Sequence, residues 1–159
     1  MTSGAVKVVF VCWGNICRSP IAERVAERAA ADAGLTGVEF TSAATSREEI
    51  GAPIDPRARR VLADHGYRTE GHAAHQITAE EIAGADLVVA AEPVHVDRML
   101  RIAPAADNLS LLSAYDPDAP EGSGLPDPWY GGAEGFEETL AAVEAAMPGV
   151  LAEVRRRQR

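Results

Sequence analysis

The chain has 159 residues, which is long enough for one domain with a sizeable hydrophobic core. Its formal net charge of −9, from 24 acidic and 15 basic residues, argues against nonspecific binding to nucleic acid. No apolar run approaches the roughly 20 residues of a membrane span, and the N-terminal residues lack a signal-peptide pattern. We therefore expect a single domain over residues 1–159, located in the cytoplasm, that binds neither nucleic acid nor membrane.

Short apolar segments alternate with helical segments along the chain. β-branched, apolar runs predict four buried strands, at residues 5–11, 38–42, 86–90 and 109–112. Helix start and stop signals predict helices at residues 19–33, 56–65, from 79, 92–103 and 133–157. This alternation is typical of an α/β fold with a four-stranded parallel sheet and helices on both faces. In such folds ligands bind beyond the carboxyl ends of the strands.

Two segments depart from this regular alternation. Residues 113–132 form a long loop with four prolines, and a loop of this length inside a compact domain is usually functional or disordered. Pro148 and Gly149 interrupt the pattern of the last helix, which predicts a kink or a restart there.

The loop after the first predicted strand has the composition of an anion site. The strand ends in Cys12, and Gly14 and Asn15 lead on to Arg18, Ser19 and a helix. A strand that turns into a helix leaves backbone N–H groups without partners, and these bind anions together with the helix dipole. Gly and Asn tolerate the positive φ that lets such a loop turn its N–H groups inward. The guanidinium of Arg18 can bind two phosphate oxygens at once. The helix N-terminus and this arginine both stabilise a thiolate on Cys12, which is the nucleophilic form of the side chain.

Other interpretations of this loop remain open. Cys12 could be a buried structural thiol before an ordinary strand–helix turn, since a Cys-x5-Arg spacing alone is a weak pattern. Cys12 and Cys17 could also form a disulfide, which makes a noncatalytic phosphate-binding or thiol-redox module the alternative from another class. The joint pattern of strand, cysteine, Gly-Asn, Arg-Ser-Pro and helix favours the anion site. With both cysteines in one loop, a reducing compartment is expected.

Cleavage of a phosphate monoester also needs an acid that protonates the leaving oxygen. Three aspartates that precede prolines are candidates, namely Asp55, Asp116 and Asp127, and their spacing does not choose among them. Trp129 and Tyr130 lie close behind the last of these, and their rings would supply a flat wall for a phenyl group.

Residues 12–23, Cys-Trp-Gly-Asn-Ile-Cys-Arg-Ser-Pro-Ile-Ala-Glu, resemble the signature of the low-molecular-weight protein tyrosine phosphatases, and the likeness extends along most of the chain. The resemblance implies hydrolysis of phosphotyrosine and aryl phosphates through a phosphocysteine on Cys12, with no metal or other cofactor. Inorganic phosphate would be both product and inhibitor. Asp127 lies in a segment similar to the family's Asp-Pro-Tyr-Tyr-Gly loop and would be the general acid, with Trp129 in place of the first tyrosine.

The resemblance also assigns the residues around the nucleophile. The phosphate would be held by residues of the loop, namely Trp13, Gly14, Asn15, Ile16, Cys17 and Arg18. Ser19 would donate to the sulfur of Cys12. Ser42 and His72 match a serine and a histidine that support the loop asparagine in the family.

Three positions depart from the family pattern. Glu48 stands where the family commonly has Trp or Tyr at the mouth of the cleft, so it would weaken stacking and repel acidic peptides. His75 replaces an arginine and Glu92 replaces an aspartate.

Related activities of the same fold fit less well. Arsenate reductases need further cysteines downstream, and the chain has none after Cys17. Protein-arginine phosphatases remain a second alternative, but they carry a threonine where this chain has Ile16, and an apolar residue fits an aryl substrate better.

Overall fold

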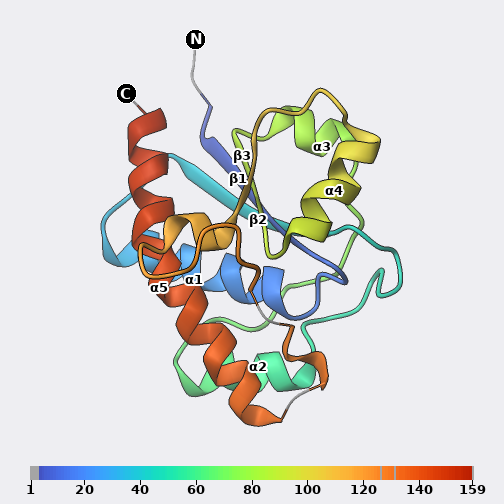
Figure 1. Cartoon of the computed structure of the whole chain (residues 1–159). Coiled ribbons are helices and arrows are strands. Elements are labelled where there is room, and N and C mark those ends of the chain that lie inside the picture. The colour runs from blue at the N-terminus through green and yellow to red at the C-terminus, as the bar shows by residue number, and fades with distance from the viewer. Residues whose placement is uncertain (1–3, 126, 131, 159) are drawn as a thin grey trace.

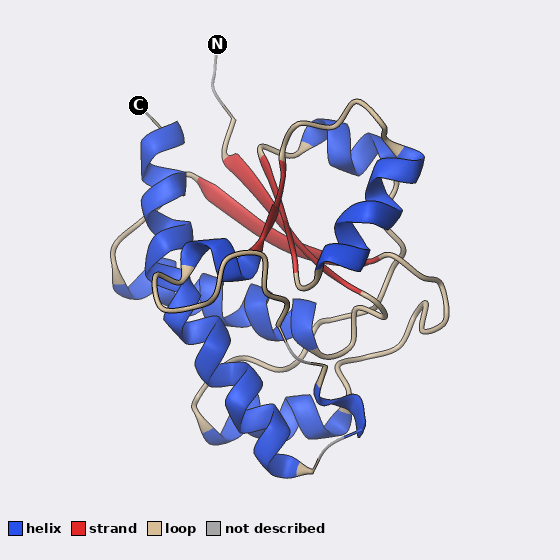
Figure 2. Ribbon diagram, viewed as in Figure 1, coloured by secondary structure: helices blue, strands red, loops and turns tan. Residues whose placement is uncertain are grey.

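A four-stranded parallel sheet runs through the molecule, with helices on both of its faces (Figures 1 and 2). The structure is a computed structural model that describes residues 4–125, 127–130 and 132–158, except the side chain of Tyr130. The strands are β1 (Val6–Cys12), β2 (Val38–Ala44), β3 (Leu87–Ala90) and β4 (Leu109–Leu111). Their order in the sheet is β2-β1-β3-β4, and every pair is parallel. The predicted fold class is confirmed.

The helices begin and end near their predicted positions. They are α1 (Arg18–Asp32), α2 (Pro56–Asp64), α3 (Ala79–Gly84), α4 (Pro93–Ile102) and α5 (Ala133–Arg157), with 3-10 turns η1 (Leu112–Tyr115) and η2 (Pro128–Tyr130). Gly34, at φ +67°, ends α1 in a left-handed conformation. The carboxylate of Asp55 caps α2 by accepting from the backbone N–H of Arg57, and Thr78 and Glu81 form a capping box at α3.

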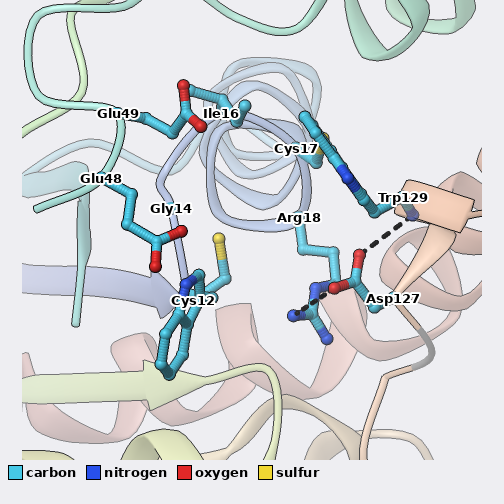
Figure 3. A pocket seen from close by; sticks show the side chains of 10 residues that line it. Cys12, Gly14, Ile16, Cys17, Arg18, Glu48, Glu49, Asp127 and Trp129 are labelled. Atoms are coloured by element: carbon cyan, nitrogen blue, oxygen red, sulfur yellow. Dashed lines mark hydrogen bonds and ion pairs between the residues drawn. The ribbon is translucent and has the colours of Figure 1, made fainter. Parts of the chain in front are cut away.

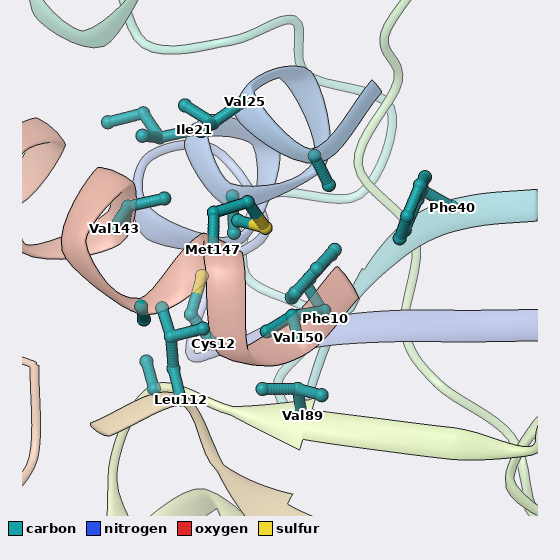
Figure 4. Packing of buried hydrophobic residues seen from close by; sticks show 14 of the residues in the cluster. Phe10, Cys12, Ile21, Val25, Phe40, Val89, Leu112, Val143, Met147 and Val150 are labelled. Carbon is teal, nitrogen blue, oxygen red and sulfur yellow. The ribbon is translucent and has the colours of Figure 1, made fainter. Parts of the chain in front are cut away.

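Alternate side chains of β1 point to opposite faces of the sheet. Val8 and Phe10 pack into the larger core with α1, α2 and α5, whereas Val9 and Val11 pack into the smaller core under α3 and α4. Figure 4 shows the larger core, where Phe10 lies beside side chains of α5. Cys12 continues the row of Val8 and Phe10, so the sheet places it at the carboxyl end of its central strand, on the side of α1.

The last helix has its predicted bounds but differs from the prediction at one point. α5 continues through Pro148 and Gly149 as one helix, so the predicted restart is wrong. At this point α5 lies against η1 so closely that a Cβ on Gly149 would overlap the carbonyl oxygen of Tyr115. The glycine therefore serves close packing between α5 and η1. The long proline-rich loop is also partly ordered into η1 and η2, the second of which follows Asp127.

Candidate active site

The loop between β1 and α1, residues 13–17, is fixed by hydrogen bonds that its carbonyl groups accept from other segments. Backbone N–H groups of residues after β2 donate to two of these carbonyl groups, Ser46 to Trp13 (3.0 Å) and Asp55 to Ile16 (2.8 Å), and Thr45 donates to the carbonyl of Cys12 just before the loop (3.0 Å). Asn15 takes the left-handed conformation, at φ +59°. Within the part of the chain that the structure describes, the N–H groups of residues 13–17 donate to no other residue. The loop therefore presents a set of N–H donors to an anion.

A buried hydrogen-bond network holds the left-handed residue of this loop in place. The side-chain amide of Asn15 donates to the Oγ atoms of Ser19 (2.8 Å) and Ser42 (3.0 Å). Its Oδ1 accepts from the backbone N–H of His75 (3.2 Å). Nε2 of His72 donates to the carbonyl of Asn15 (2.7 Å), and burial lowers the pKa of His72, which favours the neutral ring. Ser42 and His72 thus both contact Asn15.

Cys12 lies at the base of the loop with its sulfur close to Ser19. Oγ of Ser19 is 3.1 Å from Sγ of Cys12, and the backbone N–H of Ser19 donates to the same sulfur over 3.4 Å. The hydroxyl of Ser19 accepts from Asn15, and its own proton has two acceptors within reach, the sulfur of Cys12 at 3.1 Å and the carbonyl of Ala43 at 3.4 Å, of which the sulfur is the nearer. This arrangement stabilises a thiolate.

Arg18 begins α1, and its guanidinium is oriented by groups from distant parts of the chain. Its Nη1 donates to Oε2 of Glu92 (2.6 Å) and to the carbonyl of Leu125 (2.8 Å). Its Nη2 lies 3.6 Å from Oδ2 of Asp127. The arginine side chain is 3% exposed, whereas those of Glu92 and Asp127 are 35% and 44% exposed, so only the cationic end of these ion pairs is buried. Glu92, one of the departures from the family pattern, is thus a partner of the arginine.

Asp127 and Trp129 lie opposite Cys12 across a cavity of about 190 Å³ (Figure 3). The cavity is lined by Cys12, Trp13, Gly14, Ile16, Cys17, Arg18, Glu48, Glu49, Asp127 and Trp129. Of the three aspartates before prolines, Asp127 alone lines it, whereas Asp55 caps α2 and Asp116 holds a turn by accepting from the backbone N–H of residue 118. The positions of the three aspartates therefore favour Asp127 as the candidate acid, a choice that their spacing in the sequence could not make.

Comparison with known proteins agrees with this geometry. A family profile described as "Low molecular weight phosphotyrosine protein phosphatase" matches residues 7–159. The chain belongs to this family. A low molecular weight protein-tyrosine-phosphatase of Streptomyces coelicolor is 48% identical to this phosphatase over 154 residues, which cover 94% of this chain and 93% of that one. Low molecular weight protein-tyrosine phosphatase A of Mycobacterium tuberculosis is 39% identical over 150 residues, which cover 93% and 91%.

Solved structures show the same fold. The crystal structure of YfkJ from Bacillus subtilis superposes with a TM-score of 0.91 at 26% identity, over 100% of both chains. That of Primo-1 gives a TM-score of 0.86 at 32% identity, over 94% of this chain and 98% of that one. The resemblance seen in the sequence is thus confirmed, and this phosphatase is, as predicted, a member of a family of protein tyrosine phosphatases.

The two cysteines of this phosphatase lie in different environments. Both are free thiols and both are buried. Burial raises the pKa of the Cys17 thiol, and the nearby negative charge of Asp55 raises it further. Cys17 is therefore a neutral thiol at ordinary pH, and only Cys12 has the hydrogen-bond partner in Ser19 that a thiolate needs.

Both tryptophans line the cavity, and an arginine guanidinium stacks on the ring of each. The guanidinium carbon of Arg98 lies 4.4 Å from the ring centroid of Trp13, and that of Arg57 lies 4.8 Å from the ring centroid of Trp129. Trp129 is 40% exposed, which suits a wall that receives an aryl group. The side chain of Tyr130, the other predicted wall residue, lies outside the described residues.

Several contacts of the site involve residues that no sequence motif marks. The carbonyl of Leu125 accepts from Arg18, and the carboxylate of Glu23 accepts from Ser42 (2.6 Å). The arginines that stack on the two tryptophans are also outside any motif. Glu92 and His95 are linked as well, since the backbone N–H of Glu92 donates to Nδ1 of the buried His95 (3.1 Å).

No group of His, Cys, Asp and Glu able to hold a metal ion occurs among residues 4–125, 127–130 and 132–158. In the same segments, no helix is long and apolar enough to cross a membrane.

Proposed function

We propose that this phosphatase hydrolyses phosphotyrosine in proteins, and simple aryl phosphates, through a phosphocysteine on Cys12. The observation that carries the proposal is the sulfur of Cys12 at the base of a loop whose N–H groups have no acceptor in the described chain. Such donors bind the phosphate of the substrate, and they are most useful where its oxygens gain charge in the transition state.

In the first step the thiolate of Cys12 attacks phosphorus in line with the aryl oxygen. The S–P bond forms as the P–O bond breaks, and Asp127, in its protonated form, gives its proton to the departing phenolate. Arg18 is held by Glu92 and the carbonyl of Leu125 through Nη1. Its Nε and its Nη2, which lies 3.6 Å from Oδ2 of Asp127, would bind the phosphate oxygens. The aryl ring would lie between the two tryptophans.

In the second step a water molecule attacks the phosphocysteine. Asp127, now a carboxylate, takes the proton of this water, and the S–P bond breaks to release inorganic phosphate. Ser19 donates its hydroxyl proton in a hydrogen bond to the sulfur, which makes the thiolate a better leaving group. Inorganic phosphate fits the same loop and is therefore expected to inhibit competitively. We also propose a reducing, cytoplasmic setting, because Cys12 acts only as a free thiolate.

The test is the hydrolysis of aryl phosphates under reducing conditions by the wild type and four variants. We expect no turnover by Cys12→Ser. Arg18→Ala should lose about 10²–10³-fold in kcat, the effect of removing one donor to a developing anion. Asp127→Ala should lose about 10²–10⁴-fold, and least on substrates with good leaving groups.

The matched control for the acid is Asp116→Ala, which removes another aspartate before a proline, outside the cavity. It should hydrolyse like the wild type. Absence of turnover by the reduced wild type would contradict the proposal, and the loop would then be studied as an anion-binding or redox site.

A further inference from the structure

Arg57 lies outside the cavity and contacts two residues of the segments around it. One is Asp55, which holds the phosphate-binding loop, and the other is Trp129, which follows the proposed acid Asp127. We propose that Arg57 is a positioning residue, which holds Asp127 and Trp129 over Cys12. This inference rests on the proposed function, because it assigns to Arg57 a role in placing the general acid.

The first half of the connection runs from the phosphate-binding loop to Arg57. The backbone N–H of Asp55 donates to the carbonyl of Ile16 in that loop over 2.8 Å. Oδ1 of the same aspartate accepts from Nε of Arg57 (3.1 Å) and Oδ2 accepts from Nη2 (3.2 Å). Asp55 is buried, and this two-point pairing fixes the plane of the guanidinium.

The second half runs from Arg57 to the acid. Its remaining nitrogen, Nη1, donates to the carbonyl of Trp129 over 2.8 Å. The guanidinium carbon lies 4.8 Å from the ring centroid of Trp129 and 4.9 Å from that of the buried Phe136 in α5. The backbone N–H of Trp129 in turn donates to Oδ1 of Asp127 over 3.0 Å. Arg57 therefore joins α2, α5 and the acid segment at one point.

This arrangement uses the whole guanidinium group. Three nitrogens make hydrogen bonds, and the flat face contacts two aromatic rings. A lysine could replace the charge but not the planar fork with its several fixed donors. Asp127 itself is 44% exposed and contacts Arg18 over 3.6 Å, so the hold on Trp129 is an important constraint on where the carboxyl group lies.

Loss of the Arg57 side chain should impair proton donation by Asp127 and leave the nucleophile Cys12 intact. A displacement of about 1 Å at a reacting group can cost about 10²-fold in rate. Arg57→Ala should therefore lower kcat by about 10–10²-fold on aryl phosphates with poor leaving groups, where the acid matters most. On substrates with good leaving groups the loss should stay below about threefold, because such phenolates depart without a proton.

The matched control is Arg28→Ala. Arg28 also stacks on an aromatic ring, that of Tyr67 (5.4 Å), and donates to a backbone carbonyl, that of Gly66 (3.1 Å), but it lies away from the cavity. This variant should keep the leaving-group dependence of the wild type. Alkylation of Cys12 by iodoacetate should proceed at the wild-type rate in both variants, since the loop and its thiolate are unchanged.

A second readout does not depend on activity. The chain has two tryptophans, so in a Trp13→Phe background the fluorescence comes from Trp129 alone. Quenching by acrylamide should increase when Arg57→Ala is added and stay the same when Arg28→Ala is added. Should Arg57→Ala fail to fold, Arg57→Lys provides the test, and it should show the same selective loss on poor leaving groups to a smaller degree.

The outcomes separate this inference from the proposed function. If the wild type hydrolyses aryl phosphates and Arg57→Ala keeps the same leaving-group dependence and the same quenching, the positioning role is overturned while the proposed function stands. A uniform loss on all substrates with slowed alkylation would also overturn it, because the damage would then lie in the phosphate-binding loop. If the wild type hydrolyses none, the proposed function fails and the positioning role of Arg57 in proton donation fails with it.

Discussion

The buried His95 should make the stability of the protein fall as the pH falls. His95 lies on α4 beside the ion pair of Arg18 and Glu92, and its side chain is 1% exposed. Burial lowers its pKa to about 4, and the positive charge of Arg18 lowers it too, against the opposing charges of Glu92 and Asp127. The ring is therefore neutral at pH 7, and its Nδ1 accepts from the backbone N–H of Glu92.

The size and sign of the effect follow from linkage. Because the pKa is about 4 in the folded protein and 6.5 ordinarily, the unfolded chain binds a proton at His95 before the folded one does. The free energy of unfolding therefore has its full contribution from His95 above pH 6.5 and loses it as the pH falls toward 4. The drop in pKa corresponds to about 3 kcal/mol, of which about 2–3 kcal/mol should be lost by about pH 4.5.

Urea denaturation at about pH 7.5 and about pH 4.5 measures this difference. His95→Asn keeps an acceptor for the N–H of Glu92 but does not titrate, so carboxylates affect it and the wild type alike. Between the two pH values the wild type should lose about 2–3 kcal/mol more than His95→Asn. The control His65→Asn changes an exposed histidine and should behave like the wild type. Equal losses in the wild type and His95→Asn would show that His95 does not couple the stability of the protein to pH.

Three further substitutions test other parts of the account. Ser19→Ala should slow breakdown of the phosphocysteine by about 10–10²-fold, the value of one hydrogen bond to a charged sulfur, and rapid mixing should reveal a burst of phenol before slow turnover. Gly149→Ala should lower the free energy of unfolding by about 1–3 kcal/mol because its Cβ would overlap the carbonyl of Tyr115, whereas Gly84→Ala, with open space around it, should not. Glu48→Gln should raise kcat/KM for phosphotyrosine peptides with acidic neighbours by at most about fivefold, and 1 M salt should remove the difference.

The fold was predictable because its signals are local. β-branched runs, the glycine after α1 and the capping residues of α2 and α3 mark where elements begin and end, and the structure has them within a few residues. Alternation of strands and helices gave the parallel sheet. The order β2-β1-β3-β4 was not predicted, since the order depends on how crossover connections pack rather than on any one segment.

In the site, too, the features within one short stretch were predictable and the contacts between distant segments were not. The loop from Cys12 to Arg18 was recognisable because its residues act together over a short stretch. The groups that orient Arg18 come from residues 92 and 125, and nothing in those segments marks them as partners. Arg57 was overlooked because the sequence Asp55-Pro56-Arg57 is already explained as a helix start. Its contacts with Trp129 and Phe136 exist only once α2 and α5 are folded together.

The most direct test of the central claim is to detect the phosphocysteine. Wild type and Asp127→Ala would be mixed with an aryl phosphate, quenched rapidly at low pH and digested with trypsin, and the peptide Val8–Arg18 examined by tandem mass spectrometry. We expect a phosphoryl group on Cys12 and none on Cys17. Turnover of the substrate without any phosphorylated Cys12, or with the phosphoryl group on another residue, would contradict the proposed mechanism.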